Sequence, residues 1–149
     1  MTARRREREP ILQFSVFTPN RLGRLHEVVR RLAQHEVHLV ALTVLDTTDS
    51  TIVRFVVDNP NQARKLMKEH GFAFVESHLV AVELAYERQL QDVLEALLEA
   101  ELNIHYIYPF LTRPGGKSAL ALNIEHSDVA EDILTKRGFT VLHQGDITR

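Results

Sequence analysis

The stretch from Thr18 to Leu25 holds the residues of this sequence that are best suited to bind a small molecule. An apolar segment, 11–17, precedes it and an amphipathic segment follows, which predicts a strand that turns into a helix. Asn20 is a preferred residue type just before a helix, and Gly23 has no Cβ to hold a ligand away from the backbone. A helix start leaves about four N–H groups without intrahelical partners and carries roughly half a positive charge. The stretch therefore predicts a binding site for a small anion such as a carboxylate.

The residues around this turn admit a second interpretation, which is purely structural. Arg21 and Arg24 would add positive potential to an anion site, but they could equally be solvated. Gly23 could simply permit a tight turn and Asn20 could simply cap the helix, because a lone glycine motif is weak evidence. The duplication of the whole unit, described below, supplies the structural context that favours a ligand. The candidate ligand-binding residues are Asn20, Arg21, Leu22, Gly23, Arg24 and Leu25.

No other residues form a convincing catalytic or metal-binding group. The chain has eight histidines and no cysteine, which excludes disulfides and thiolate chemistry. His35 and His38 straddle a predicted helix end and strand start, so their rings need not converge on a metal ion. His26 and Glu27 are adjacent on a predicted helix and point apart, and no nucleophile stands in a recognisable elbow. We expect no catalytic residue, no metal, no cofactor and therefore no enzyme.

Composition and charge indicate a globular protein without a charged polymer as its partner. The 149 residues are 44% hydrophobic and 26% charged, and the net charge is −2. Nucleic acids and anionic membranes call for a basic excess, so we expect neither as a partner. No apolar run approaches the roughly 18 residues of a membrane span. Residues 1–10 are charged and lack an apolar core, so we expect a solvated tail, no signal peptide and a cytoplasmic location.

The pattern of apolar residues predicts the element order βαββαβ twice. The first half has predicted strands at 11–17, 39–45, 51–58 and 72–77, with helices at 22–36 and from Asn59 or Asn61 to His70. The second half has predicted strands at 79–85, 104–110, 118–124 and 139–144, with helices at 88–100 and 127–137.

The two halves are related by a measurable internal repeat. Gly71 and Gly138, each of which is expected to close a helix, stand 67 positions apart. The apolar stripe of the first helix reappears 65 positions later, as Leu25, Val28, Val29 and Leu32 match Leu90, Val93, Leu94 and Leu97. We predict an α+β fold of two ferredoxin-like units in tandem, 11–77 and 78–149, each an antiparallel sheet with its helices on one face. Too few residues separate the units for independent motion.

The two repeated units resemble the ACT domain, a small ferredoxin-like regulatory module that binds amino acids and similar ligands. The resemblance rests on the turn Asn20-x-x-Gly23-x-Leu25, on the helix after it and on 37–39 at the start of the second strand. The turn is especially similar to that of the regulatory subunits of acetolactate synthase. The resemblance implies that an amino acid lies between two ACT modules, with its carboxylate on the N–H groups around Gly23 and its polar head on Asn20. It also implies a regulatory role.

The second copy departs from the ACT pattern at the equivalent turn, residues 86–90. This turn has no glycine, and Glu87 would repel a carboxylate. The second unit is therefore expected either to serve as a structural half or to form the other wall of the first unit's pocket.

An RNA-recognition module shares the βαββαβ order but stacks bases on aromatic side chains of its central strands. The candidate strand here has one aromatic residue, Phe55, whose alternation with Val53 and Val57 places it toward the helices. Tyr106 and Tyr108 share a face, as tyrosines at a sheet–sheet or subunit contact do. RNA binding is thus disfavoured.

On each sheet, the face that points away from the helices is predicted to be apolar, and an exposed apolar face usually marks an interface. The residues expected there are Ala41, Thr43, Ile52, Val56, Ala119 and Ala121. They predict a homodimer or docking on a metabolic enzyme.

The functional hypothesis is an amino-acid sensor in which the ligand shifts the arrangement of modules or subunits. The alternative is a structural regulatory subunit that binds no ligand and docks on an enzyme.

Overall fold

The computed structural model describes residues 9–19 and 23–148. The strands are β1 (Ile11–Pro19), β2 (Leu39–Asp46), β3 (Ser50–Val57), β4 (Ala73–Leu84), β5 (Ile104–Pro109), β6 (Ser118–Ile124) and β7 (Val141–Leu142). The helices are α2 (Arg24–Gln34), α3 (Pro60–Glu69), α4 (Gln89–Glu99), α5 (Ser127–Lys136) and α6 (Gln144–Ile147), with a 3₁₀ turn η1 at Pro114–Gly116. The predicted fold class, two ferredoxin-like units in tandem, is confirmed.

The two sheets are joined through β4, which belongs to both. The strand order is β2-β3-β1-β4-β6-β5, β7 also pairs with β4, and every pairing is antiparallel. Residues 73–79 of β4 pair with β1, and Val80 to Leu84 pair with β6. The two strands predicted at 72–77 and 79–85 are therefore one continuous strand. The predicted unit boundary after residue 77 falls inside it.

The second correction concerns the end of the chain. A strand was predicted at 139–144, but β7 covers only Val141–Leu142 and is followed by the short helix α6. The Gln144 amide group ties α6 to the first unit: Oε1 accepts from the N–H of Leu12 at 3.0 Å, and Nε2 donates to the carbonyl of Val57 at 3.2 Å. Ile147 of α6 is buried between the sheets. These tertiary contacts replace strand pairing at this end.

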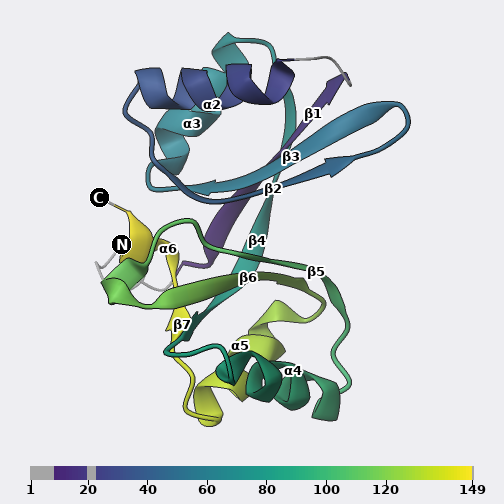
Figure 1. The fold of residues 1–149 in the computed structure, drawn as a ribbon, viewed down its shortest axis with the longest axis vertical. Coiled ribbons are helices and arrows are strands. Elements are labelled where there is room, and N and C mark those ends of the chain that lie inside the picture. The colour runs from purple at the N-terminus through teal and green to yellow at the C-terminus, as the bar shows by residue number, and fades with distance from the viewer. Residues whose placement is uncertain (1–8, 20–22, 149) are drawn as a thin grey trace.

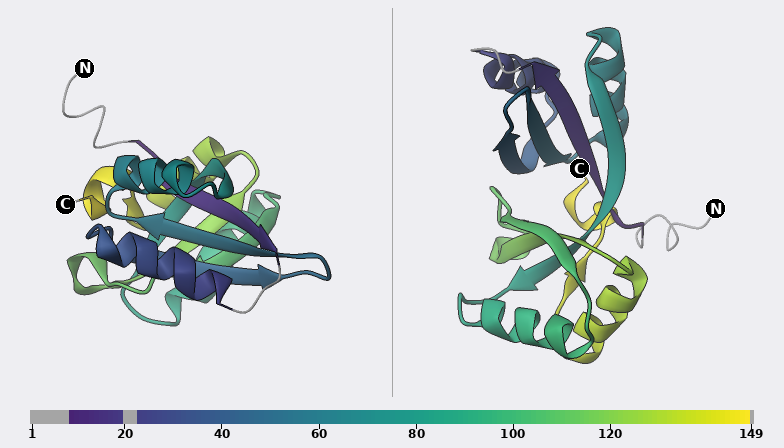
Figure 2. Two further views of the ribbon diagram at one scale, coloured as in Figure 1. Left: turned by 90° about the horizontal axis from the view of Figure 1, so that it is seen from above. Right: turned by 90° about the vertical axis from the view of Figure 1, so that its right-hand side faces the viewer.

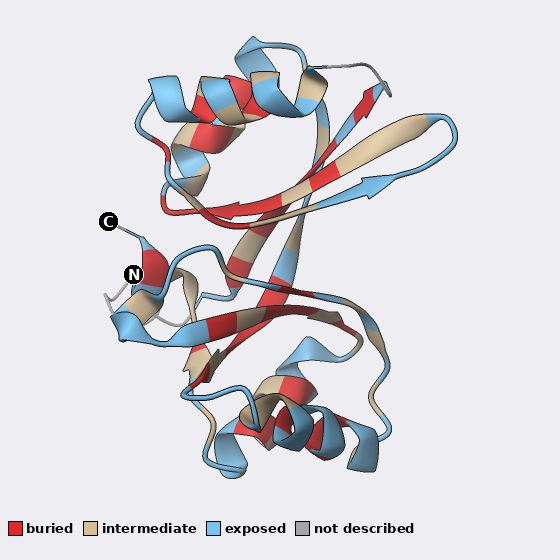
Figure 3. Ribbon diagram, in the orientation of Figure 1, coloured by how far each residue is buried: buried red, intermediate tan, exposed pale blue. Residues whose placement is uncertain are grey.

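The molecule has four layers, with α2 and α3 on the outer face of one sheet and α4 and α5 on the outer face of the other (Figure 1). Figure 3 shows buried residues on the strands and exposed ones on the outer sides of the helices. Phe14 and Phe55 stack at 5.5 Å between the first sheet and its helices, so Phe55 faces the helices as predicted. Phe55 is therefore not available to stack an RNA base.

The internal repeat extends to the way the helices end. The N–H of Val37 donates to the carbonyl of Leu32 after α2, and the N–H of Leu102 donates to that of Leu97 after α4. In each case the residue before the donor is a glutamate with a left-handed backbone conformation: Glu36 has φ 58° and Glu101 has φ 57°. These pairs are 65 positions apart, the same offset as the apolar stripe. Gly71 and Gly138 close α3 and α5 with φ 69° and 88°, as predicted.

One core lies between each sheet and its own helices. A third core lies between the two sheets, where the faces that point away from the helices pack on each other. Its buried members are Ile11, Val40, Ala41, Val56, Leu79, Ala81, Tyr108, Ala119, Ala121, Leu142 and Ile147. Four residues predicted to face a second chain, Ala41, Val56, Ala119 and Ala121, are buried here within one chain, while Thr43 and Ile52 are half-buried. The assignment of this face to a homodimer or to enzyme docking is wrong, because each unit covers the other.

The buried Gln13 forms the polar centre of this third core. Its Nε2 donates to the hydroxyl of Tyr106 at 2.7 Å and to that of Ser77 at 3.0 Å, and its Oε1 accepts from the hydroxyl of Tyr108 at 2.6 Å. The guanidinium of Arg54 lies 4.2 Å from the centre of the Tyr106 ring. These bonds join β1 of the first unit to β5 of the second. Tyr106 and Tyr108 thus line a sheet–sheet contact, one of the two positions predicted for them.

Replacing Gln13 should destabilise the chain more than replacing an exposed glutamine does. Gln13→Leu leaves the two tyrosine hydroxyls without their amide partner, which we expect to cost about 2 to 3 kcal/mol of unfolding free energy. Chemical denaturation measures the loss. Gln34→Leu at the exposed end of α2 is the matched control and should change stability by less than about 0.5 kcal/mol. Equal stability of the two variants would contradict the role of Gln13.

High pH should weaken the contact between the sheets. Burial, helped by the neighbouring Tyr106, raises the pKa of Tyr108 above its ordinary value, and Arg54 opposes this in part. The unfolded chain therefore releases the proton of Tyr108 first, so stability should fall as pH rises above about 10. Tyr108→Phe should make this decline shallower in denaturation curves collected across that range. An unchanged pH dependence in this variant would contradict the assignment.

Candidate functional site

The predicted site begins where β1 ends, at the start of α2. The helix begins at Arg24, and the residue before it is Gly23, with φ 87° and ψ −5°. The N-cap position is therefore Gly23 and not the predicted Asn20. Asn20 and its neighbours Arg21 and Leu22 lie outside the described residues. Gly23 has no side chain with which to cap the helix, and its left-handed backbone suits glycine because other residues are strained there.

The first backbone amides of α2 are the groups with which this turn could hold an anion. The first hydrogen bond of the helix runs from the N–H of Glu27 to the carbonyl of Gly23, at 2.9 Å. The amides of Arg24, Leu25 and His26 precede it and so have no partner four residues back within the helix. Among the described residues outside α2, none accepts a hydrogen bond from these three amides. Backbone N–H groups at a helix start are of the kind that can bind a carboxylate.

The charges beside these amides are more balanced than the sequence suggested. Arg24 was expected to add positive potential, but its Nη1 lies 2.9 Å from Oε2 of Glu27, and both side chains are about one-third exposed. The guanidinium also lies 5.9 Å from the centre of the Phe72 ring. The helix dipole favours a carboxylate near its first turn, and Glu27 already supplies one. A ligand carboxylate would therefore compete with Glu27 for Arg24.

In the equivalent turn of the second unit, the first two amides of α4 are already bonded. The N–H groups of Gln89 and Leu90 donate to the carbonyls of Tyr86 and Glu87, at 3.1 and 3.0 Å. The side chain of Gln89 accepts from the N–H of Ala85 at 2.5 Å. The residue before α4, Arg88, has a right-handed helical backbone conformation, with φ −57°. This turn is closed by the protein itself.

The two turns also lie apart in the chain. Figure 1 places the start of α2 at the top of the molecule and the start of α4 at the bottom. Within one chain, the turn before α4 therefore does not border the turn before α2, and the role of the second unit as a pocket wall stays a prediction.

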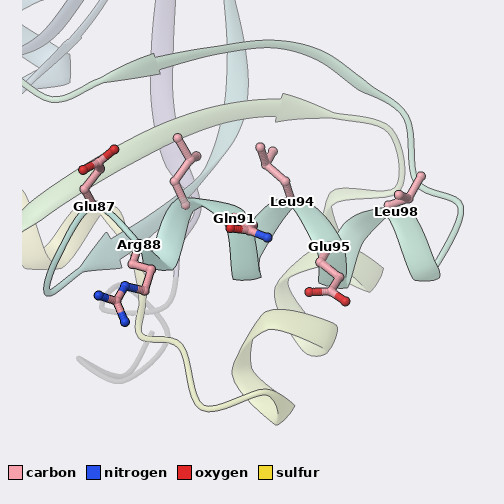
Figure 4. A pocket seen from close by; sticks show the side chains of 7 residues that line it. Glu87, Arg88, Gln91, Leu94, Glu95 and Leu98 are labelled. Carbon is pink, nitrogen blue, oxygen red and sulfur yellow. The ribbon is translucent and has the colours of Figure 1, made fainter.

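A shallow groove of about 650 Å³ runs along α4 and was not singled out from the sequence (Figure 4). Its lining residues are Glu87, Arg88, Leu90, Gln91, Leu94, Glu95 and Leu98. Leu94 was predicted to belong to the core stripe, but it is 39% exposed, and Leu98 is 75% exposed. The four-residue spacing of Leu90, Leu94 and Leu98 was the signal that could have revealed a second apolar face.

Comparison with known proteins decides the family. Residues 9–149 match the family described as an ACT domain pair. The chain belongs to this family. Among curated proteins, no sequence matches the chain significantly. A crystal structure of a Bacteroides thetaiotaomicron protein is 26% identical, with a TM-score of 0.84 over 94% of this chain and 96% of that one.

Two further structures similar to this ACT domain pair share its fold at lower identity. The regulatory subunit of aspartate kinase from Thermus thermophilus, in a ligand-free form, is 15% identical, with a TM-score of 0.59 over 85% of this chain and 91% of that one. Escherichia coli aspartokinase III in complex with lysine and aspartate is 15% identical, with a TM-score of 0.52 over 87% of this chain and 31% of that one. At these identities, the likeness shows the fold alone.

The structure describes residues 9–19 and 23–148 of this ACT domain pair. Within these residues, no group of three or more histidine or acidic side chains could hold a metal ion. His38 is engaged instead with Asp58, through Nδ1 and Oδ2 at 2.8 Å. None of the helices described is both long and apolar enough to cross a bilayer.

The backbone at Gly23 should make this position sensitive to any side chain. A Cβ added there meets no atom within 4 Å, so the cost of Gly23→Ala is the left-handed backbone alone, about 1 to 2 kcal/mol of unfolding free energy. Gly71→Ala, with φ 69° and equally open surroundings, is the matched control and should lose a similar amount. Denaturant melts measure both. A Gly23→Ala variant as stable as the wild type would show that the turn does not require glycine.

Proposed function

We propose that this ACT domain pair is a cytoplasmic regulatory protein that binds an amino acid at the start of α2 and is not itself an enzyme. The observation that carries the proposal is the left-handed Gly23, which brings three amides without described partners to the surface at a helix start. Membership of the family supports a regulatory role. The ligand carboxylate would lie on the amides of Arg24 and Leu25, with Asn20, Arg21 and Leu22 as neighbours.

The names of two structural neighbours support an amino acid as the ligand. One is a regulatory subunit of aspartate kinase, and the other is an aspartokinase in complex with lysine and aspartate. A free amino acid offers few atoms for contact, so its affinity should be modest.

The way the two units are joined bears on the mechanism. They share β4 and the core around Gln13, so a ligand has little freedom to change the arrangement of the units within one chain. The ligand would therefore act on the contact between this chain and another one. If an enzyme subunit or a second copy of the chain binds the liganded form more tightly than the free form, the ligand favours that complex.

The alternative is a regulatory subunit that binds no ligand and docks on a metabolic enzyme as a structural element. The ion pair between Arg24 and Glu27 supports it, because Glu27 already supplies the negative charge at the start of α2. The closed second turn supports it too, since its amides are bonded by the protein itself.

Thermal unfolding with the twenty amino acids separates the two functions. At ten times Kd, a ligand that binds only the folded chain should add about 1.4 kcal/mol of stability and raise Tm by roughly 3 to 6 °C. Gly23→Val should abolish the rise, because strain in the left-handed backbone at this position shifts the first amides of α2. Gly71→Val, which carries the same backbone strain away from the turn, should keep the rise. A flat response of the wild type to the whole panel would favour the structural subunit.

A further inference from the structure

Two rows of side chains continue the inner face of the first sheet, the face away from its helices, beyond the third core. Gln13 of β1 faces that core, so Ser15 and Phe17, two and four residues later, lie on the same face of the sheet. The strand register extends these two positions across all four strands. The first row is Thr43, Arg54, Ser15 and Val75, and the second row is Leu45, Ile52, Phe17 and Ala73. We call these eight residues the open rows.

The second unit leaves much of the open rows uncovered. The hairpin formed by β2 and β3 projects beyond the second unit (Figure 2, left). Figure 3 shows the end of β2 as exposed and the beginning of β3 as half-buried. Val75 is 53% exposed, Leu45 is 48% exposed and Phe17 is 38% exposed. A group of exposed apolar side chains on one face is typical of a place where another molecule binds.

Arg54 supplies the charge of this face. Its guanidinium lies over the Tyr106 ring, and its Nε is buried without a hydrogen-bond partner. Among the described residues, none forms a hydrogen bond or an ion pair with the guanidinium. A guanidinium has five N–H donors, and a charge that is partly removed from water is costly unless it is paired. An anion bound to Arg54 would supply the pairing.

The residues around Arg54 indicate which kind of anion fits. Its neighbours in the row, Thr43 and Ser15, carry hydroxyl groups, and the second row is entirely apolar. None of the eight residues is acidic. A free amino acid carries an ammonium group next to its carboxylate, and the open rows offer that ammonium group no negative partner. The face therefore suits a carboxylate that is attached to an apolar body without an amino group.

We propose that the open rows bind a small carboxylic acid that has an apolar body and no amino group. The carboxylate pairs with the guanidinium of Arg54, a geometry in which two parallel hydrogen bonds can form. The apolar body lies on Leu45, Ile52 and Phe17. The two rows are about 7 Å apart along the strands, so a ring that is two or three carbons away from the carboxylate reaches both. This site does not rest on the amino-acid site at the start of α2.

NMR titration of the full chain, labelled with ¹⁵N, tests the site with 3-phenylpropionate, which is phenylalanine without its amino group. The amide signals of the open rows should shift, with a Kd on the order of 1 mM because the acid has few atoms. Phenylalanine adds the ammonium group, and 3-phenylpropan-1-ol removes the charge. Each should bind the open rows roughly tenfold more weakly or worse, since hydrogen bonds between charged groups contribute about that factor.

Substitutions on the two rows test the roles of charge and of apolar contact. Arg54→Gln should raise the Kd of 3-phenylpropionate by on the order of tenfold or more, and Arg54→Lys, which keeps the charge, should raise it less. Leu45→Asp should also raise the Kd by about tenfold, because it removes apolar contact and repels the carboxylate. Val44→Asp is the matched control. Val44 is adjacent on β2 and 41% exposed but lies on the opposite face, so the Kd should stay unchanged.

The amino-acid site is tested separately in the same titration. Gly23→Val should leave the Kd of 3-phenylpropionate unchanged, whatever it does to the binding of amino acids. The proposal is overturned if the open-row amides do not shift, if Arg54→Gln binds as tightly as the wild type, or if the alcohol binds as tightly as the acid. Shifts of these amides with protein concentration alone would show that a second copy covers the open rows instead, which also overturns it. Circular dichroism confirms that each variant is folded.

Discussion

The continuity of β4 constrains everything else in this molecule. Because residues 73–79 complete the first sheet and Val80 to Leu84 begin the second, the sheets cannot separate without breaking one strand. They fold back so that their faces away from the helices meet, and the buried residues of the third core fill the space between them. Gln13, Tyr106 and Tyr108 satisfy one another's polar groups within that core, which is the condition under which polar groups are tolerated in an apolar interior.

The two units differ at the surface although they have the same arrangement of helices and strands. Helix ends are reproduced from one unit to the other, down to the left-handed Glu36 and Glu101. The turns before α2 and α4 are not reproduced, because one carries the left-handed Gly23 and the other is closed by its own backbone hydrogen bonds. The helix charges differ as well. The two units therefore share one backbone arrangement and differ in the residues at their surface.

The elements were predictable because their signals are local. The alternation of Phe14 and Val16 in β1, and the spacing of Val28 and Leu32 in α2, follow from the periods of strand and helix, and both pairs are buried as these periods require. Two predicted strand boundaries were wrong, because they depend on tertiary contacts. The join of 72–77 to 79–85 depends on strand partners from both units, and the replacement of the last strand by α6 depends on bonds from Gln144 to Leu12 and Val57. At the candidate site, the sequence indicated a glycine just before a helix, and Gly23 lies there. The Arg24–Glu27 pair and the groove along α4 emerged only with the side chains in place.

The amino-acid sequence by itself determined the duplicated βαββαβ order, the side of each strand that faces the helices, and the turn at which a glycine precedes a helix. Each of these depends on residues close together in the chain, so periodicity and residue type suffice. Only the tertiary structure decided what covers the other faces of the sheets, because Ala41, Val56, Ala119 and Ala121 look the same in the sequence whether their partner is the same chain or another. Burial of an apolar face lowers the free energy in either case, and the geometry of β4 selects the partner within the chain.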